Sequence, residues 1–279
     1  MNIFMPIDHL QRIAKPLLPA GPDDWLSHNI EKGQSKEQYR DAVDSRPIKL
    51  PGAIYLYPYF DSTPFEEHLM QVAAGFLTDY FSVSVRVSTR PPEPKLTPYN
   101  KFKHDIGCGK RVASKDILFA MRPTRDGLPS DHIPSDGHAH ILVTDYDLWY
   151  EPDDQDDWLF GLAGGDGRAV VSTARLMRTH STECIDFARF LKILSHEVGH
   201  TLHFAHCIDA NCNMNGTNSL NEVDLHPIEL CPYCLRKLYL LSPFNPLNRV
   251  SRLIATLTDI GVDLTDDYFY LEKRLLETN

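Results

Sequence analysis

Two hydrophobic periodicities alternate along the amino-terminal half of the chain. Short runs typical of strands cover 53–60 (AIYLYPYF) and 82–87 (SVSVRV), and 139–149 (AHILVTDYDLW) opens with an apolar run that fits a strand buried on both faces. Helical spacing is expected over 64–79 and 115–121. The order strand, helix, strand, helix, strand predicts a sheet covered by helices.

A hairpin and an amphipathic helix follow. Residues 159–176 read as two short strands joined by the turn GGDG, whose three glycines we expect to supply positive φ angles. Residues 187–204 carry apolar side chains at helical spacing, and 246–260 and 264–277 read as further helices. We therefore expect an α+β fold with a mixed, mostly parallel sheet and a helical carboxyl-terminal subdomain.

Composition and charge narrow the class of protein. The chain has 279 residues, of which 42% are hydrophobic, enough for a real core. Its 28 Lys and Arg against 38 Asp and Glu give a net charge of −10, which argues against nucleic acid and anionic membranes as partners. No secretory or membrane-spanning apolar run is evident, so we expect a soluble, cytoplasmic protein.

The densest motif is SHEVGHTLHFAHC, residues 195–207, which contains HExxH. His196 and His200 are one helical turn apart and can hold one zinc ion, with Glu197 beside them as a general base. His206, six residues beyond His200, can fold back as a third imidazole. Three histidines that leave one coordination position open are typical of a catalytic zinc.

The cysteines are distributed as a second metal site. Four of the six lie at Cys207, Cys212, Cys231 and Cys234, in two close pairs. Two such pairs predict a closed, structural zinc site with four thiolates, and they indicate a reducing compartment rather than a disulfide scaffold. Cys108 and Cys184 are isolated, and we expect them to be unreactive buried thiols.

Together, HExxHxxxxxHC, CxM and CPxC over 196–234 closely resemble the archaemetzincins, a family of metzincin zinc metalloproteases with a second, four-cysteine zinc. The resemblance covers roughly 137–241. It implies a zincin-like fold, two zinc ions per chain, hydrolysis of peptide bonds and a peptide or protein substrate. It further implies that Met214 forms the Met-turn beneath the zinc ligands, and that 160–166 pairs with extended substrate.

The domain division follows the same resemblance. Residues 1–50 are polar, broken by Pro and Gly, and we interpret them as a lead-in segment without functional information. We expect 51–279 to form one metzincin-like catalytic domain, with an upper subdomain at 51–206 and a lower one at 207–279 that holds the structural zinc. We expect the protein to act as a monomer.

Several alternatives remain open. The metzincin pattern has glycine where this chain has His203, which could compete with His206 as third ligand, and Glu222 could do so in another type of zincin. The protein could instead be a non-catalytic two-zinc peptide-binding protein. Residues 160–166 could be an ordinary hairpin, and the acidic stretch 145–157 either a solvated loop or a site for cations.

Overall fold

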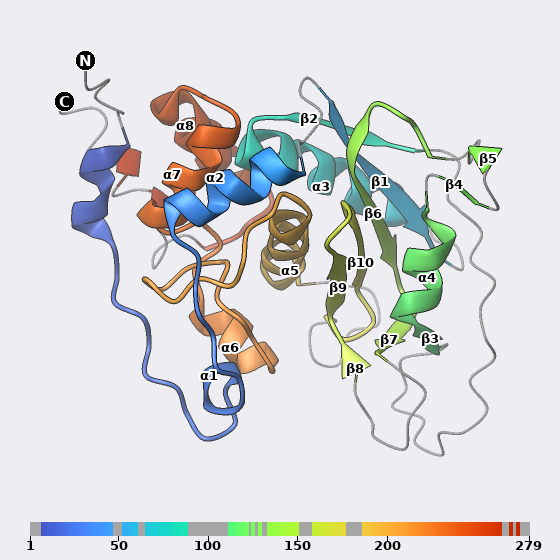
Figure 1. The fold of residues 1–279 in the computed structure, drawn as a ribbon, viewed down its shortest axis with the longest axis horizontal. Coiled ribbons are helices and arrows are strands. Elements are labelled where there is room, and N and C mark those ends of the chain that lie inside the picture. The colour runs from blue at the N-terminus through green and yellow to red at the C-terminus, as the bar shows by residue number, and fades with distance from the viewer. Residues whose placement is uncertain are drawn as a thin grey trace.

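The central sheet is mixed and mostly parallel. The computed structural model describes residues 7–46, 52–60, 65–88, 111–122, 124–125, 128–129, 133–150, 158–176, 186–263, 268–269 and 272–273. Its main sheet has the order β2-β1-β6-β10-β9 (Figure 1), with strands β1 (Ala53–Tyr59), β2 (Ser84–Val87), β6 (Gly137–Thr144), β9 (Gly161–Gly164) and β10 (Arg168–Ser172). Neighbouring strands are parallel except β9, which pairs antiparallel with β10 at the edge. The predicted fold class is confirmed.

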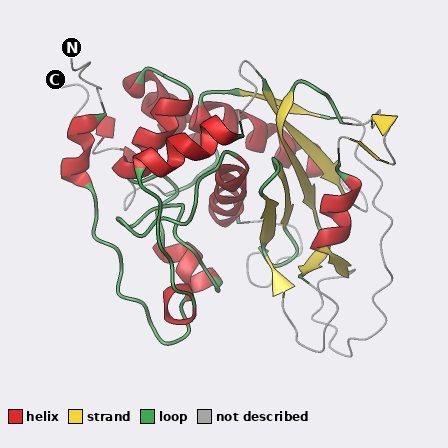
Figure 2. Cartoon of the chain, in the orientation of Figure 1, coloured by secondary structure: helices red, strands yellow, loops and turns green. Residues whose placement is uncertain are grey.

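Helices surround this sheet and fill the carboxyl-terminal part (Figure 2). Their bounds are η1 Asp8–Ile13, α1 Trp25–His28, α2 Lys36–Ser45, α3 Phe65–Phe81, α4 Ser114–Ala120, α5 Phe187–Thr201, α6 Leu220–Leu225, α7 Pro232–Leu241 and α8 Pro246–Asp259. Smaller sheets comprise β3 (Arg111–Ala113), β7 (Asp147–Trp149) and β8 (Trp158–Leu159), and β4 (Thr124–Arg125) and β5 (Leu128–Pro129). None of the helices among these residues has the length and apolar character needed to cross a bilayer.

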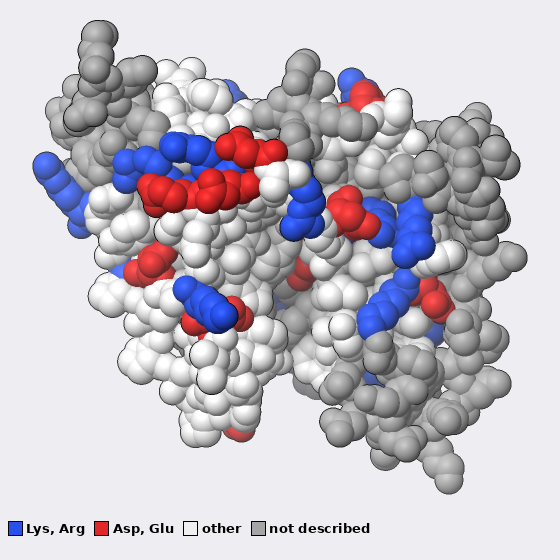
Figure 3. All heavy atoms as spheres, in the orientation of Figure 1, with Lys and Arg blue, Asp and Glu red and all other residues white. Residues whose placement is uncertain are grey.

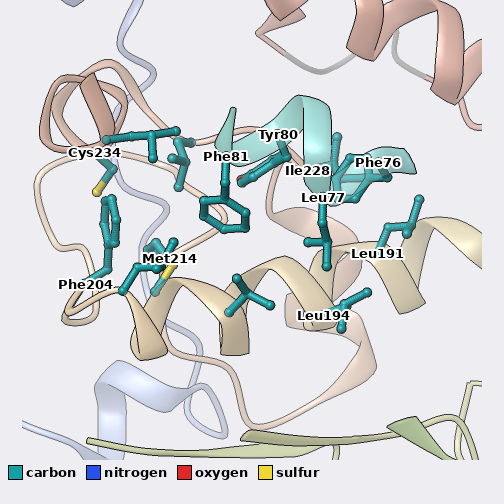
Figure 4. Packing of buried hydrophobic residues seen from close by; sticks show 14 of the residues in the cluster. Phe76, Leu77, Tyr80, Phe81, Leu191, Leu194, Phe204, Met214, Ile228 and Cys234 are labelled. Atoms are coloured by element: carbon teal, nitrogen blue, oxygen red, sulfur yellow. The ribbon is translucent and has the colours of Figure 1, made fainter. Parts of the chain in front are cut away.

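Strand alternation divides the interior into two cores. On β1, Ile54 and Leu56 face the larger core with α3 and α5, whereas Tyr55 and Tyr57 face a smaller one with α4. Figure 4 shows the larger core, where side chains of α3 lie over those of α5. The helix α5 is thereby fixed against the sheet, with β9 and β10 beside it.

The segment 139–149 is not one strand. β6 ends at Thr144, and after a bend β7 starts at Asp147 in a different sheet. Asp147 is fully buried, with carboxylate oxygens 2.7 Å from Arg111 Nε and 2.6 Å from Arg175 Nε. The prediction of a solvated acidic loop is therefore wrong at this residue, because two arginines of the chain compensate its charge.

The hairpin of β9 and β10 is confirmed, but its turn uses one special glycine rather than three. Among Gly164, Gly165 and Gly167, Gly167 alone has a positive φ, of 84°. Other expectations lie outside the described residues: Cys108, Cys184, the acidic residues 151–157 and nearly all of the helix at 264–277.

Candidate metal centre and active-site cleft

The helix α5 supplies two of the three histidines. It begins at the N-cap Asp186, whose side chain accepts a hydrogen bond from Arg189 N, and its apolar face is buried in the larger core. His196 and His200, one turn apart, project from the opposite face. Their Nε2 atoms lie 3.0 Å apart.

The third histidine is brought back by the turn that ends α5. His203 has a φ of 69°, Phe204 N donates to Gly199 O at 3.1 Å, and this pattern is a Schellman cap with His203 in the left-handed position. His203 thus takes the backbone conformation of the glycine in the metzincin pattern. The chain reverses, and one ring nitrogen each of His196, His200 and His206 lies within 4.8 Å of the other two.

Each imidazole is held by its Nδ1 atom. His196 Nδ1 donates to Asn213 O and His200 Nδ1 to Phe204 O, both at 2.8 Å. His206 Nδ1 lies 2.6 Å from Glu31 Oε1. A neutral imidazole that donates its proton from Nδ1 has its lone pair on Nε2, the tautomer that a metal ligand requires.

The protonation states also fit a cation. Burial lowers the pKa of His196 well below its ordinary value and lowers that of His200 to about 4, so both rings are neutral near pH 7. The Nε2 atoms of these rings present lone pairs to each other at 3.0 Å, an arrangement that a shared cation would satisfy. Neutral imidazoles are donors suited to zinc.

Glu197 lies in the same site, between α5 and the edge strand β9. Its side chain is buried, and burial raises the pKa of its carboxyl group to about 8, whereas a cation bound beside it would favour the ionised carboxylate. A Cβ at Gly161 of β9 would lie 2.6 Å from Glu197 Cγ, so the absence of a side chain at Gly161 makes room for this glutamate.

A cleft of about 480 Å³ opens over these groups. One wall is β9 with the adjoining 158–160 and 165, and the other includes Trp25, Lys192, Thr217, Asn218, Val223 and His226. β9 is the last strand of the sheet, so within the described residues its outer edge is unpaired and borders the cleft. On the face seen in Figure 3, acidic and basic side chains of the described residues are interspersed, most visibly along α2.

The four predicted cysteines form a second cluster. Their sulfur atoms lie within 4.8 Å of one another, all four residues are buried, and none is in a disulfide. Cys231 N and Met214 N donate to Cys212 Sγ at 3.1 and 3.4 Å, and hydrogen bonds from the other thiols lower the pKa of Cys207. Buried, convergent sulfurs that accept backbone N–H bonds suit a closed tetrahedral metal site.

A tight turn at Met214 links the two clusters. Cys207 N donates to Met214 O at 2.7 Å, and Asn215 closes the turn by receiving Cys212 N and donating to Cys207 O. The Met214 side chain packs against the carboxyl-terminal end of α5, near Phe204 (Figure 4). The backbone that leaves the third histidine is thus hydrogen-bonded directly to the turn under the histidines.

The two alternative ligands lie elsewhere. His203 Nε2 donates to Arg46 O at 2.9 Å, outside the histidine cluster. Glu222 is buried, but its carboxylate oxygens accept Trp25 N at 2.9 Å and Asn218 N at 2.6 Å. The third position of the cluster is occupied by His206.

Sequence reasoning missed four residues of this site. Glu31 and Trp25 come from the lead-in segment, which was expected to carry no functional information, and they meet His206 across 175 and 181 residues of chain. No local pattern marks them. Gly161 and Gly199 are also essential to the packing, and a glycine inside a strand or helix was the available signal.

Known proteins resemble the chain over this region and beyond. A family model described as Peptidase family M54 matches residues 112–239. Archaemetzincin-2 of Mus musculus is 42% identical over 282 residues, covering 88% of this chain and 76% of the relative. Archaemetzincin of Halobacterium salinarum is 35% identical over 180 residues, covering 62% of this chain and 92% of the relative.

A solved structure is also similar. The zinc-dependent peptidase from Methanocorpusculum labreanum superposes with a TM-score of 0.50 at 25% identity, covering 66% of this chain and 99% of that chain. The sequence motifs, the fold and these relatives agree. The chain belongs to the archaemetzincin family of zinc metallopeptidases.

Proposed function

We propose that His196, His200 and His206 hold the catalytic zinc and that Glu197 is the general base for peptide-bond hydrolysis. The observation that carries this proposal is the convergence of one ring nitrogen from each of three histidines beside the buried side chain of Glu197, at the floor of a cleft bordered by an edge strand. A zinc ion in this position supplies Lewis-acid chemistry, lowering the pKa of water and stabilising negative charge on a carbonyl oxygen.

The residues of the chain have separate parts in the reaction. The Glu197 carboxylate takes a proton from the attacking water and returns it to the amine that leaves when the C–N bond breaks. Gly161 places β9 against this carboxylate, so an extended peptide paired with the outer edge of β9 would have its backbone beside Glu197. This arrangement supports the substrate-binding role of 160–166 over an ordinary hairpin.

We propose that the four cysteines hold a second, structural zinc. Through Cys207 and the Met214 turn, this site would fix both the segment leaving His206 and the Asn213 carbonyl that orients His196. Met214 would then serve as the methionine of the Met-turn. Two zinc ions per chain follow from this assignment.

The expectations for domain division, oligomeric state and location are proposed on the basis of the same site. We propose that 51–279, divided at 206/207, is the part of the catalytic domain that supplies the metal ligands and the general base, and that the active form is a monomer, since one chain supplies every group used. Free thiols at the four-cysteine site suit a reducing, cytoplasmic location. The non-catalytic alternative was based on His203 replacing the glycine of the metzincin pattern. Because His203 takes the backbone conformation of that glycine, this argument no longer applies.

Glu197→Gln tests the general base. The variant should keep the zinc content of the wild type and lose about 10²- to 10⁴-fold in kcat on a cleavable peptide. Glu67→Gln, an exposed substitution on α3, is the matched control and should change neither quantity. A peptide-library screen with and without chelator identifies the substrate for the assay.

Two results would contradict the proposed function. If Glu197→Gln cleaves at the wild-type rate, Glu197 is not the base. If the wild type holds both metals and cleaves no peptide in the library, the peptide-binding alternative replaces this proposal.

A further inference from the structure

Residues 21–46, here termed the N-terminal strap, lie across the segment that carries the third histidine. Gln34 Nε2 donates to His203 O at 2.9 Å, and Gln34 Oε1 accepts Ala205 N at 3.3 Å. At Gly33, which has a φ of 65°, a Cβ would lie 2.7 Å from Ile208 Cγ1. The strap therefore follows the chain closely on both sides of His206.

At the centre of this contact, one carboxylate oxygen of the strap receives two donors. Glu31 Oε1 lies 2.6 Å from His206 Nδ1 and 2.7 Å from Trp25 Nε1. The glutamate and histidine side chains are 22% and 19% exposed, so water is largely excluded from the pair. A bond of this length to a carboxylate is a strong, charge-assisted hydrogen bond.

Trp25 is itself fixed on three sides. Its backbone N donates to Glu222 Oε1 at 2.9 Å, and its ring covers Gly216 so closely that a Cβ there would lie 2.4 Å from Trp25 Cδ1. The ring also stands edge-on to His206, with centroids 5.1 Å apart. The indole N–H is consequently directed at Glu31 by the packing around it.

The three histidines differ in what holds them. His196 and His200 donate Nδ1–H to backbone carbonyls 17 and 4 residues further along the chain, whereas His206 donates to a charged side chain 175 residues away. A carboxylate partner fixes the tautomer of a metal-binding imidazole and raises the basicity of its other nitrogen. His206 lies after a turn, whereas His196 and His200 lie on a helix. Of the three rings, that of His206 therefore depends most on a hydrogen bond from another segment.

We propose that Glu31 is the positioning residue of His206, and that Trp25 holds Glu31 in place, so that the N-terminal strap is part of the metal centre. This inference rests on the proposed function in assigning His206 to the catalytic zinc. The alternative is that the Glu31–His206 pair merely attaches the strap to the domain.

The test uses the full chain and measures zinc affinity at the histidine site. The variants are Glu31→Ala, which removes the acceptor, Glu31→Gln, which keeps an acceptor oxygen without the charge, and Trp25→Phe, which removes the indole donor. Glu37→Gln, an exposed change on the same strap with the same loss of charge, is the control, and His206→Ala marks complete loss of the site. Chelator competition gives the affinity. Cobalt substitution shows which of the two sites a measured affinity belongs to, because thiolate-bound cobalt shows near-ultraviolet charge-transfer absorption that imidazole-bound cobalt lacks.

We expect Glu31→Ala to weaken zinc binding at the histidine site about ten- to a hundredfold, the usual effect of losing such a partner. Glu31→Gln and Trp25→Phe should show smaller losses, and Glu37→Gln none. The four-cysteine site should bind metal as in the wild type in all of them. If Glu31→Ala does not fold, Glu31→Gln and Trp25→Phe carry the test.

Other results overturn the inference. If the Glu31 and Trp25 variants bind zinc at the histidine site within twofold of wild type, while the metal-free variants melt at lower temperature, the pair is only an attachment of the strap. If the wild type binds no metal at the histidine site and His206→Ala changes nothing, the proposed function itself fails.

Discussion

Met214 and Gly199 are in direct contact beneath the histidines. A Cβ built at Gly199 would lie 2.5 Å from Met214 Sδ and 3.1 Å from its Cε. Gly199 is the residue before His200 in HExxH, so the packing of the turn depends on a helical position that carries no side chain.

Gly199→Ala should therefore destabilise the protein, although alanine favours helices. Overpacking against Met214 is expected to cost about 1–3 kcal/mol, measured as the free energy of unfolding in urea. Gly75→Ala in the middle of α3 is the control, because a Cβ there meets nothing within 4 Å. That change should stabilise the protein by about 1 kcal/mol, the ordinary helix-propensity gain. Equal effects at the two glycines would contradict the contact.

The left-handed conformation at His203 gives a second prediction. His203→Gly should be about 1 kcal/mol more stable than His203→Ala, since both lose the hydrogen bond to Arg46 and alanine alone keeps the steric cost of a positive φ. Unfolding free energies of the two variants measure the difference.

The same variants address the identity of the third ligand. Both His203 variants should keep wild-type zinc content, whereas His206→Ala should lose one zinc per chain. Undiminished zinc in His206→Ala would refute the ligand assignment.

Gly161→Ala should impair catalysis while leaving the metal in place. The new Cβ would lie 2.6 Å from Glu197 Cγ, so the glutamate side chain would have to move. A misplaced catalytic group of this kind costs about 10²-fold in rate. Gly75→Ala in α3, away from the cleft, is the control, because a Cβ there meets nothing within 4 Å. The readouts are kcat and zinc per chain. Wild-type turnover in Gly161→Ala would show that the position of the general base does not depend on the space at Gly161 of β9.

Loss of one cysteine should affect both clusters. Cys231→Ser should lower the melting temperature and also the zinc occupancy of the histidine site, because the Met214 turn connects Cys207 to the carbonyl that holds His196. Tyr233→Ser, an exposed neighbour on α7, should change neither. A Cys231→Ser protein with normal activity and normal melting would disprove the link.

Local patterns predicted most of the architecture and the two clusters. His196 and His200 could be paired because helical periodicity places them on one face, and the cysteine pairs could be grouped by spacing. The sheet order required the structure, since the neighbouring strands β1 and β6 are separated along the chain by residues 60–136. Helical spacing was expected over 187–204, whereas α5 ends at Thr201 and His203 takes the left-handed cap conformation; the glycine of the metzincin pattern at this position was the available signal.

Long-range electrostatic partners could not be predicted. Asp147 was interpreted with its acidic neighbours in the sequence, but Arg111 and Arg175 approach it from other segments and remove it from solvent. Glu31 has no periodic or motif context at all. In both cases the partner is determined by tertiary packing, which a single sequence does not display.

The span between Glu31 and His206 also has a consequence for synthesis of the protein. A ribosome adds Glu31 of the strap 175 residues before it adds His206, the histidine to which Glu31 is hydrogen-bonded. The contact closes a very long loop, so it forms late in folding, after most of the chain has emerged. Nascent or truncated chains that end before His206 therefore carry Trp25 and Glu31 without the proposed third ligand, and we expect them to have no peptidase activity.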